Sequence, residues 1–134
     1  MAEATVRKPR PKHLNLVQIR LPLPGIVSIL HRISGVALFL CLPLLLWLFG
    51  ASLGSQEELD SFRAVFDFSL LGLPVVKLVL LGLLWSFLHH FCAGIRFLLL
   101  DMHIGIELPA ARMSSVIVLV VSLTLTVVMG VLIW

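Results

Sequence analysis

The sequence predicts an all-α integral membrane protein with three transmembrane helices. Of its 134 residues, 60% are hydrophobic and only 13% are charged, and the mean hydropathy is +1.11. An ordinary soluble domain carries about twice that share of charged residues. The apolar residues also gather into three runs, each longer than the roughly 20 residues that a helix needs to cross a bilayer.

The amino-terminal segment, residues 1–25, is basic and is expected to lie along the cytoplasmic surface of the membrane. It holds five of the ten Lys and Arg residues. A signal peptide would continue from its basic region straight into an apolar stretch, whereas Pro22 and Pro24 interrupt this segment and should prevent a regular helix before residue 26. We therefore expect the segment to remain attached. Its charge indicates membrane topology, and nucleic acid is not expected as a partner.

Residues 26–134 form the expected membrane anchor. The spans are placed at about 26–53, 70–100 and 114–134. Pro43 lies inside the first span and should kink the helix slightly, because proline lacks the N–H and its ring crowds the preceding turn. The connections are an acidic one, 54–69, and a short mixed one, 101–113.

The basic residues also predict the orientation. Arg96 and Arg112 flank the second connection, whereas the first connection contains only Arg63. Loops rich in Lys and Arg stay on the inside of the membrane. The amino terminus and the second connection are therefore expected to be cytoplasmic, and the carboxyl terminus periplasmic.

His90 lies inside the second span, near the middle of the membrane. It is separated by 13 residues from Lys77 and by 11 from Asp101, or roughly 20 and 16 Å along a straight helix. A histidine at that depth needs a partner inside the bundle. Gly94, one turn away, would leave room for a flat ring, so His90 fits an axial haem ligand. A hydrogen bond to a neighbouring helix is an equally open interpretation of this span alone.

The neighbouring His89 points about 100° away from His90, so the two cannot both ligate one iron. The glycine one turn further on favours His90. A haem with two histidine ligands needs the second one from another helix. His31 is expected to be too shallow in the membrane for this role, and His13 and His103 lie outside the spans. The second ligand is therefore expected from another chain, which predicts a hetero-oligomer.

Ser28, His31 and Arg32 form a polar stripe at the start of the first span. Arginine offers several hydrogen-bond donors and serine offers one, so Ser28 and Arg32 together could hold an oxygen of a quinone head group or a haem propionate. Alternatively, Arg32 extends to the lipid headgroups and Ser28 caps the helix. The third polar group, His31, makes this purely structural interpretation less favourable.

Asp101 ends the second span, three turns from His90 and on nearly the same face. It either feeds protons toward a reducing site or simply ends the helix in water, and the residues alone favour the second. The cysteines, Cys41 and Cys92, lie inside apolar runs and are expected to be spectator thiols.

Two motifs together resemble those of a known family. They are Ser28-Ile-Leu-His-Arg-Ile-Ser-Gly35 in the first span and His90-x-x-x-Gly-Ile-Arg96 in the second. Both are similar to motifs of the cytochrome b membrane-anchor subunit of succinate dehydrogenase (complex II), the larger of its two anchors. The resemblance extends over almost the whole chain, from RPKHLNL to the third span.

This resemblance implies a subunit of the bacterial cytoplasmic (inner) membrane that forms half of a heterodimeric haem-binding helical bundle. Its partners would be a second three-span anchor, an iron–sulfur subunit and a flavoprotein subunit. Electrons would pass from the iron–sulfur subunit to ubiquinone, and this chain would have no complete active site of its own.

The resemblance also implies roles for single residues. His90 would be an axial ligand of haem b, with the other ligand supplied by a partner subunit. Ser28 and Arg32 would bind ubiquinone, and His31 with Arg32 would lie near the haem propionates. Asp101 would take part in proton delivery from the inner side.

Phe97 departs from the family pattern, because relatives often have a histidine directly after Gly-Ile-Arg, and His89 is an additional histidine. Two alternative functions are kept. One is a fumarate reductase anchor that uses menaquinone. The other is a small transport or assembly subunit without redox chemistry, whose histidines join helices.

Overall fold

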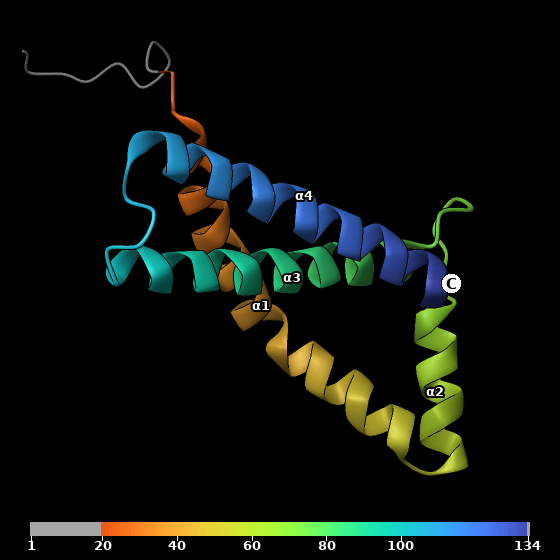
Figure 1. Cartoon of the computed structure of the whole chain (residues 1–134). Helices are drawn as coiled ribbons and strands as arrows, with labels where there is room; N and C mark the ends of the chain where they lie inside the picture. The colour runs from red at the N-terminus through yellow and green to blue at the C-terminus, as the bar shows by residue number, and fades with distance from the viewer. Residues whose placement is uncertain (1–19, 134) are drawn as a thin grey trace, which may run out of the picture.

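The computed structural model describes residues 20–133, and four helices make up most of this part of the chain (Figure 1). They are α1 (Leu23–Leu53), α2 (Gln56–Phe66), α3 (Val75–Asp101) and α4 (Leu108–Ile133). Helices α1, α3 and α4 have 31, 27 and 26 residues and are long and apolar enough to cross a membrane. The predicted all-α membrane fold is therefore confirmed. The expected position of the basic segment rests largely on residues 1–19, which are outside the described part.

Prolines lie at the starts of α1 and α4, although these helices begin earlier in the sequence than expected. Pro22 is the N-cap of α1, while Pro24 lies within its first turn. The expectation that both prolines exclude a helix before residue 26 is wrong for Pro24. A first-turn N–H has no acceptor within the helix, so proline loses no hydrogen bond there. Pro109 occupies the same kind of position, and α4 consequently begins six residues before the expected residue 114.

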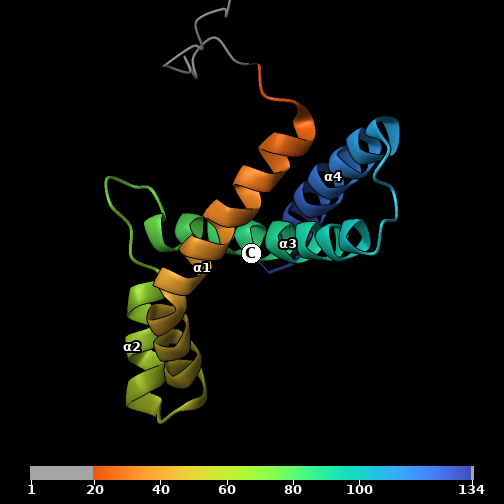
Figure 2. The same cartoon turned by 90° about the vertical axis from the view of Figure 1, so that its left-hand side faces the viewer.

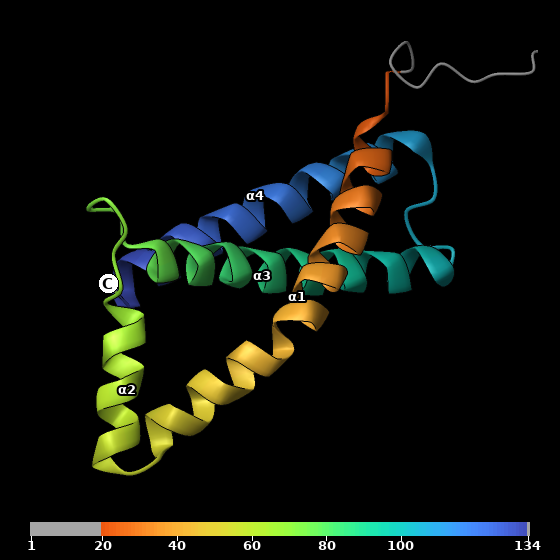
Figure 3. The same ribbon diagram turned by 180° about the vertical axis from the view of Figure 1, so that it is seen from behind.

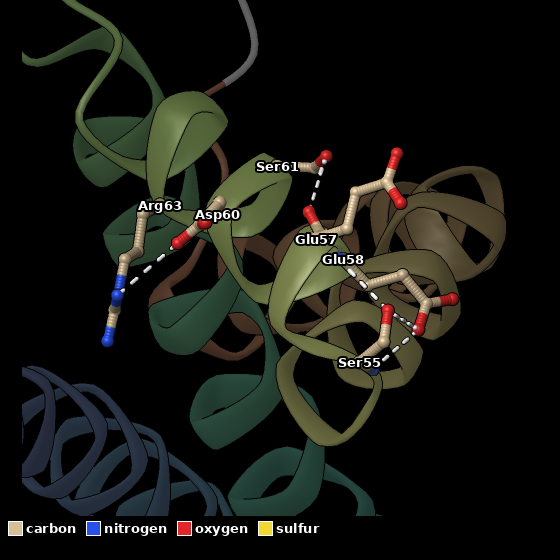
Figure 4. Close-up of polar contacts among 6 residues, drawn as sticks. All are labelled: Ser55, Glu57, Glu58, Asp60, Ser61 and Arg63. Carbon is tan, nitrogen blue, oxygen red and sulfur yellow. Dashed lines mark hydrogen bonds and ion pairs between the residues drawn. The ribbon is translucent and has the colours of Figure 1, made fainter.

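The acidic connection 54–69 contains a helix, α2, that was not predicted. Its start is fixed by a capping box, in which the Glu58 carboxylate accepts the Ser55 N–H at 2.7 Å and the Ser55 hydroxyl accepts the Glu58 N–H at 3.4 Å (Figure 4). The Ser-x-x-Glu spacing ahead of Leu59 and Phe62 is the local signal for this helix. Its apolar side chains are partly buried and its charged ones are exposed.

The three long helices pack as a side-by-side pair crossed by a third. Helices α3 and α4 run alongside each other, and α1 crosses α3 (Figures 1 and 3). Figure 3 shows that α1 changes direction about its middle, and Pro43 accounts for this bend by crowding the carbonyl of Phe39. The second half of α1 leaves α3 and runs toward α2, as Figure 2 also shows.

The core lies where α1, α3 and α4 meet, at Val27, Ala93 and Val118. Beyond this point the α3–α4 contact depends on small side chains. The polar or small residues that α4 buries are Ser115, Ser122, Thr126 and Gly130. Their hydroxyls bond to carbonyls of their own helix, as in the 2.7 Å bond from Thr126 to Ser122. They therefore leave no unpaired hydroxyl while the backbones approach closely.

The capping box makes the first turn of α2 sensitive to pH. Hydrogen bonds from the backbone and the hydroxyl of Ser55 hold the pKa of Glu58 below its ordinary value. The ionised carboxylate thus stabilises the turn at neutral pH, and this contribution is lost as the pH falls through the lowered pKa. We expect Glu58→Gln to speed amide hydrogen exchange at the start of α2 at neutral pH, but not at a pH where Glu58 is already protonated.

Glu57→Gln is the matched control, since it removes a charge from the same turn without breaking a bond to Ser55. Equal effects of the two substitutions would contradict the role of the capping box.

Candidate functional site

The two histidines from different spans meet where α1 crosses α3. The rings of His31 and His90 stack with their centroids 4.1 Å apart and their planes within 8°. His31 was expected to be too shallow to face His90 across an iron, and the expected difference in depth is wrong. The tilted crossing of α1 over α3 brings the two residues to the same level. Stacked face to face, however, they leave no room for an iron between them.

The ring of His90 is held by a polar contact to α1. Its Nδ1 lies 3.0 Å from the carbonyl oxygen of His31 and 3.3 Å from the hydroxyl of Ser34, which itself donates to the same carbonyl at 2.9 Å. A carbonyl only accepts hydrogen bonds, so Nδ1 carries the proton. Nε2 therefore carries the free lone pair, and it has no hydrogen-bond partner in residues 20–133. A metal-ligating histidine is typically held by such a bond from its other nitrogen.

A glycine on α1 makes this contact possible. A Cβ added to Gly35 would lie 2.9 Å from Cε1 of His90, which is too close for a real side chain. Gly94, which the sequence analysis placed beside His90, instead faces the ring of His31, and a Cβ there would be 3.8 Å from Nε2. Gly94 thus gives ordinary contact distances, whereas Gly35 is the position that must lack a side chain.

An open pocket of about 440 Å³ lies on this face of α1 and α3. Its lining residues are His31, Arg32, Gly35, Val36, Phe39 and His90. Arg32 is exposed and forms no hydrogen bond or ion pair with any described residue. Ser28, one turn away, is half-buried and does not line the pocket. The pocket therefore combines two imidazoles, apolar walls and one unpaired positive charge.

His89 faces a different direction from His90. Its side chain is fully buried inside the bundle, beside Trp85 at a ring distance of 5.3 Å. Neither of its ring nitrogens forms a hydrogen bond of good geometry within the described part of the chain. His89 does not line the pocket that His90 lines. Its surroundings therefore differ from those of His90, the candidate ligand.

Arg96 ties the carboxyl-terminal end of α3 to the amino-terminal end of α4. It is almost fully buried, and its guanidinium donates to the Ser114 hydroxyl at 2.9 Å and to the Ala111 carbonyl at 3.3 Å. The sequence analysis had used Arg96 only as a charge for topology and as part of a motif. The adjacent Phe97 contacts the ring of His31 at 5.1 Å. His31 is therefore enclosed between His90 and Phe97.

Asp101 is not part of this cluster. It is the last residue of α3, is exposed, and its carboxylate forms no hydrogen bond or ion pair with the described residues. It lies 11 residues from His90, or roughly 16 Å along the helix. Residues 20–133 also contain no group of three His, Cys, Asp or Glu side chains that could hold a metal ion. A metal at His90 would need its other ligands from elsewhere.

Ser34 and Gly35 were missed as site residues by sequence reasoning, although both lie within the first motif. Serine and glycine are common in membrane helices as packing residues. Only their closeness to His90 distinguishes these two from the other serines and glycines of the spans.

Comparison with known proteins gives a consistent match over the whole anchor. Residues 6–129 match the family described as succinate dehydrogenase/fumarate reductase transmembrane subunit. The chain is similar to the succinate dehydrogenase cytochrome b556 subunit of Coxiella burnetii, with 38% identity over 93% of this chain and 97% of that relative. The subunit of the same name from Paracoccus denitrificans is 34% identical over 88% of this chain and 87% of that relative. The one from Rickettsia felis is 28% identical over 93% of this chain and 92% of that relative.

The close approach at Gly35 gives a test of the histidine geometry. Alanine normally stabilises a helix by about 1 kcal/mol relative to glycine. At Gly35 the added methyl must push the ring of His90 away, so we expect Gly35→Ala to lower the thermal stability by several degrees. Gly50 in the same helix has no atom within 4 Å of an added Cβ, so Gly50→Ala should leave the melting temperature unchanged or raise it. If the Gly35→Ala protein were as stable as the Gly50→Ala protein, the close approach of the His90 ring to Gly35 would be refuted.

Proposed function

This chain belongs to the family of succinate dehydrogenase/fumarate reductase transmembrane subunits, and from that premise we propose that it holds haem b through His90 and contributes Arg32 to a ubiquinone site. It is a membrane anchor of succinate dehydrogenase and thus part of an oxidoreductase complex. Its relatives are named as cytochrome b556 subunits. The observation that carries the proposal is the bond from Nδ1 of His90 to the His31 carbonyl beside an open pocket.

The residues fit haem b. His90 presents an unprotonated Nε2, its tautomer is fixed by the 3.0 Å bond to α1, and it lines a pocket with apolar walls. Haem b, when bound, supplies a one-electron redox centre. His31 is stacked on His90 and cannot be the opposite ligand. The second axial ligand would therefore come from a partner subunit, which makes this chain one half of the haem-binding bundle.

Arg32 is the residue of this chain best placed to bind a quinone oxygen or a haem propionate. It lines the same pocket as His90 and has no anionic partner in the described residues. Its guanidinium would donate hydrogen bonds to ubiquinone and stabilise the negative charge that develops on the oxygen during reduction. Ser28, which does not line the pocket, would add a donor from the neighbouring turn of α1. His31 would lie near the propionates.

Asp101 is proposed as the point at which protons enter from the inner side. Its carboxylate is exposed at the end of α3 and carries no ion pair within the described chain. The roughly 16 Å along the helix to His90 means that water or another subunit must complete the path. This assignment rests on the family resemblance and on exposure alone.

Three apolar helices support a multi-pass protein of a bacterial membrane. The excess of basic residues before α1 supports a cytoplasmic amino terminus and a periplasmic carboxyl terminus. The complex would contain a second three-span anchor, an iron–sulfur subunit and a flavoprotein subunit. Electrons would reach ubiquinone from the iron–sulfur subunit. Neither a menaquinone-linked fumarate reductase nor a subunit without redox chemistry is favoured by the names of the relatives.

The haem assignment predicts a spectroscopic loss. A reduced-minus-oxidised spectrum of the purified complex should show a b-type band, and His90→Ala should abolish or strongly perturb it. His89→Ala is the matched control, because His89 is buried away from the pocket, and should keep a haem band. The assignment of His90 as haem ligand would be contradicted if the His90 variant kept a normal haem band. It would also be contradicted if only the His89 variant lost the band.

The quinone assignment predicts a selective loss of activity. Arg32→Ala should lower succinate:ubiquinone reductase activity at least tenfold, the effect of losing about 1.4 kcal/mol of transition-state stabilisation. Reduction of a soluble dye by the same preparation should persist, since it bypasses the anchor. Arg112→Ala removes another exposed arginine outside the pocket and should retain both activities. Parallel loss of both activities in the Arg32 variant would indicate failed assembly instead.

A further inference from the structure

The segment between α2 and α3 is a tight hairpin rather than an irregular loop. The backbone groups of Leu70 and Leu73 exchange two hydrogen bonds, each 3.0 Å long. The two residues between them, Leu71 and Gly72, have φ angles of +54° and +79°. Positive φ at both central positions is the pattern of a type I′ turn, which normally holds Asn-Gly or Asp-Gly.

Leucine is an unfavourable residue at the first of these positions. A side chain with a Cβ is strained in the left-handed region, and leucine lacks the polar group with which asparagine or aspartate offsets the strain. The side chain of Leu71 is also 96% exposed, so contacts within this subunit do not compensate. Strain of this kind persists only when something else stabilises the conformation. In water, both the turn and the exposed leucine would be unfavourable.

Apart from Ser69, the rest of the hairpin is also apolar. No charged residue occurs between Asp67 and Lys77. The other large side chains in this interval are more than half exposed, and they are Phe68, Leu70 and Leu73. The charges lie at the base instead, where the Lys77 ammonium is 3.0 Å from the Asp67 carboxylate and rests over the ring of Phe66. The hairpin therefore has a charged base and a wholly apolar tip.

The position of the hairpin along α3 matches the boundary of the membrane. The 27 residues of α3 span roughly 40 Å, about 10 Å more than the hydrocarbon core of a bilayer. A helix of this length centred on the bilayer would place its first turn among the lipid headgroups. The hairpin projects from this turn, away from the other helices (Figures 1 and 2). Its apolar surface continues that of Leu78 and Val79, which are exposed on α3.

We propose that the hairpin 68–73 inserts its tip, Leu71, into the boundary between headgroups and acyl chains of the outer leaflet. The outer side follows from the orientation proposed above. Lipid acyl chains would bury the apolar side chains, while the Asp67–Lys77 pair stays at the level of the headgroups. The hairpin is thus a second membrane contact of this subunit, separate from its three spans and independent of the haem and quinone assignments.

Photocrosslinking in the assembled complex tests the proposal. The complex carrying Leu71→p-benzoylphenylalanine is produced in native membranes, and the membranes are irradiated. This chain is then examined by mass spectrometry and gel electrophoresis. We expect the mass of the chain to increase by one phospholipid, with no crosslink to another subunit. Ser61→p-benzoylphenylalanine, on the exposed polar side of α2, should give at least tenfold less lipid adduct.

Two results would overturn the proposal. A crosslink from position 71 to another polypeptide would show that a protein covers the hairpin, and the absence of any lipid adduct would show that the tip faces water. If the Leu71 variant does not assemble, Leu73→p-benzoylphenylalanine probes the same hairpin outside the strained position. A lipid adduct there would support insertion, and its absence would count against it.

Discussion

The arrangement of the site depends on the contact between the backbone of α1 and the ring of His90. Inside a bilayer no water can satisfy a polar nitrogen, so the Nδ1 proton of His90 must find an acceptor within the protein. The carbonyl of His31 supplies it at 3.0 Å, because a helical carbonyl keeps a second lone pair. This approach is possible only because Gly35 lacks a side chain. This bond therefore fixes the tautomer of His90 and ties α3 to α1 at their crossing.

The remaining helix contacts hold this crossing in place. The small buried residues of α4 let it lie close against α3, and Arg96 joins the end of α3 to the start of α4. Phe97 packs on the ring of His31 at a centroid distance of 5.1 Å. An apolar ring there fixes His31 by contact alone and adds no further ionisable group. Helices α3 and α4 thus hold α1, with its polar stripe, in position.

The pocket is incomplete within this subunit, and its incompleteness fits an anchor of a larger complex. It offers the stacked imidazoles of His31 and His90 and one arginine on an open face, and the described part of the chain gathers no group of three side chains that could hold a metal. The second half of α1 also leaves α3 after the bend and exposes large apolar side chains such as Trp47 and Phe49. Both features agree with a heterodimeric bundle in which a second anchor closes the site.

The sequence by itself determined the class of the protein and its three apolar spans, and it singled out most of the residues proposed to carry the chemistry. These follow from local signals, namely long apolar runs and polar residues that are costly in a bilayer. A local signal for α2 was also present, in Ser55 and Glu58, but an acidic connection was predicted instead. Only the tertiary structure decided that His31 stacks on His90, that Gly35 rather than Gly94 makes the close approach, and that His89 faces inward. The depth and angle at which two helices cross depend on packing along their whole length, and no short stretch of sequence encodes them.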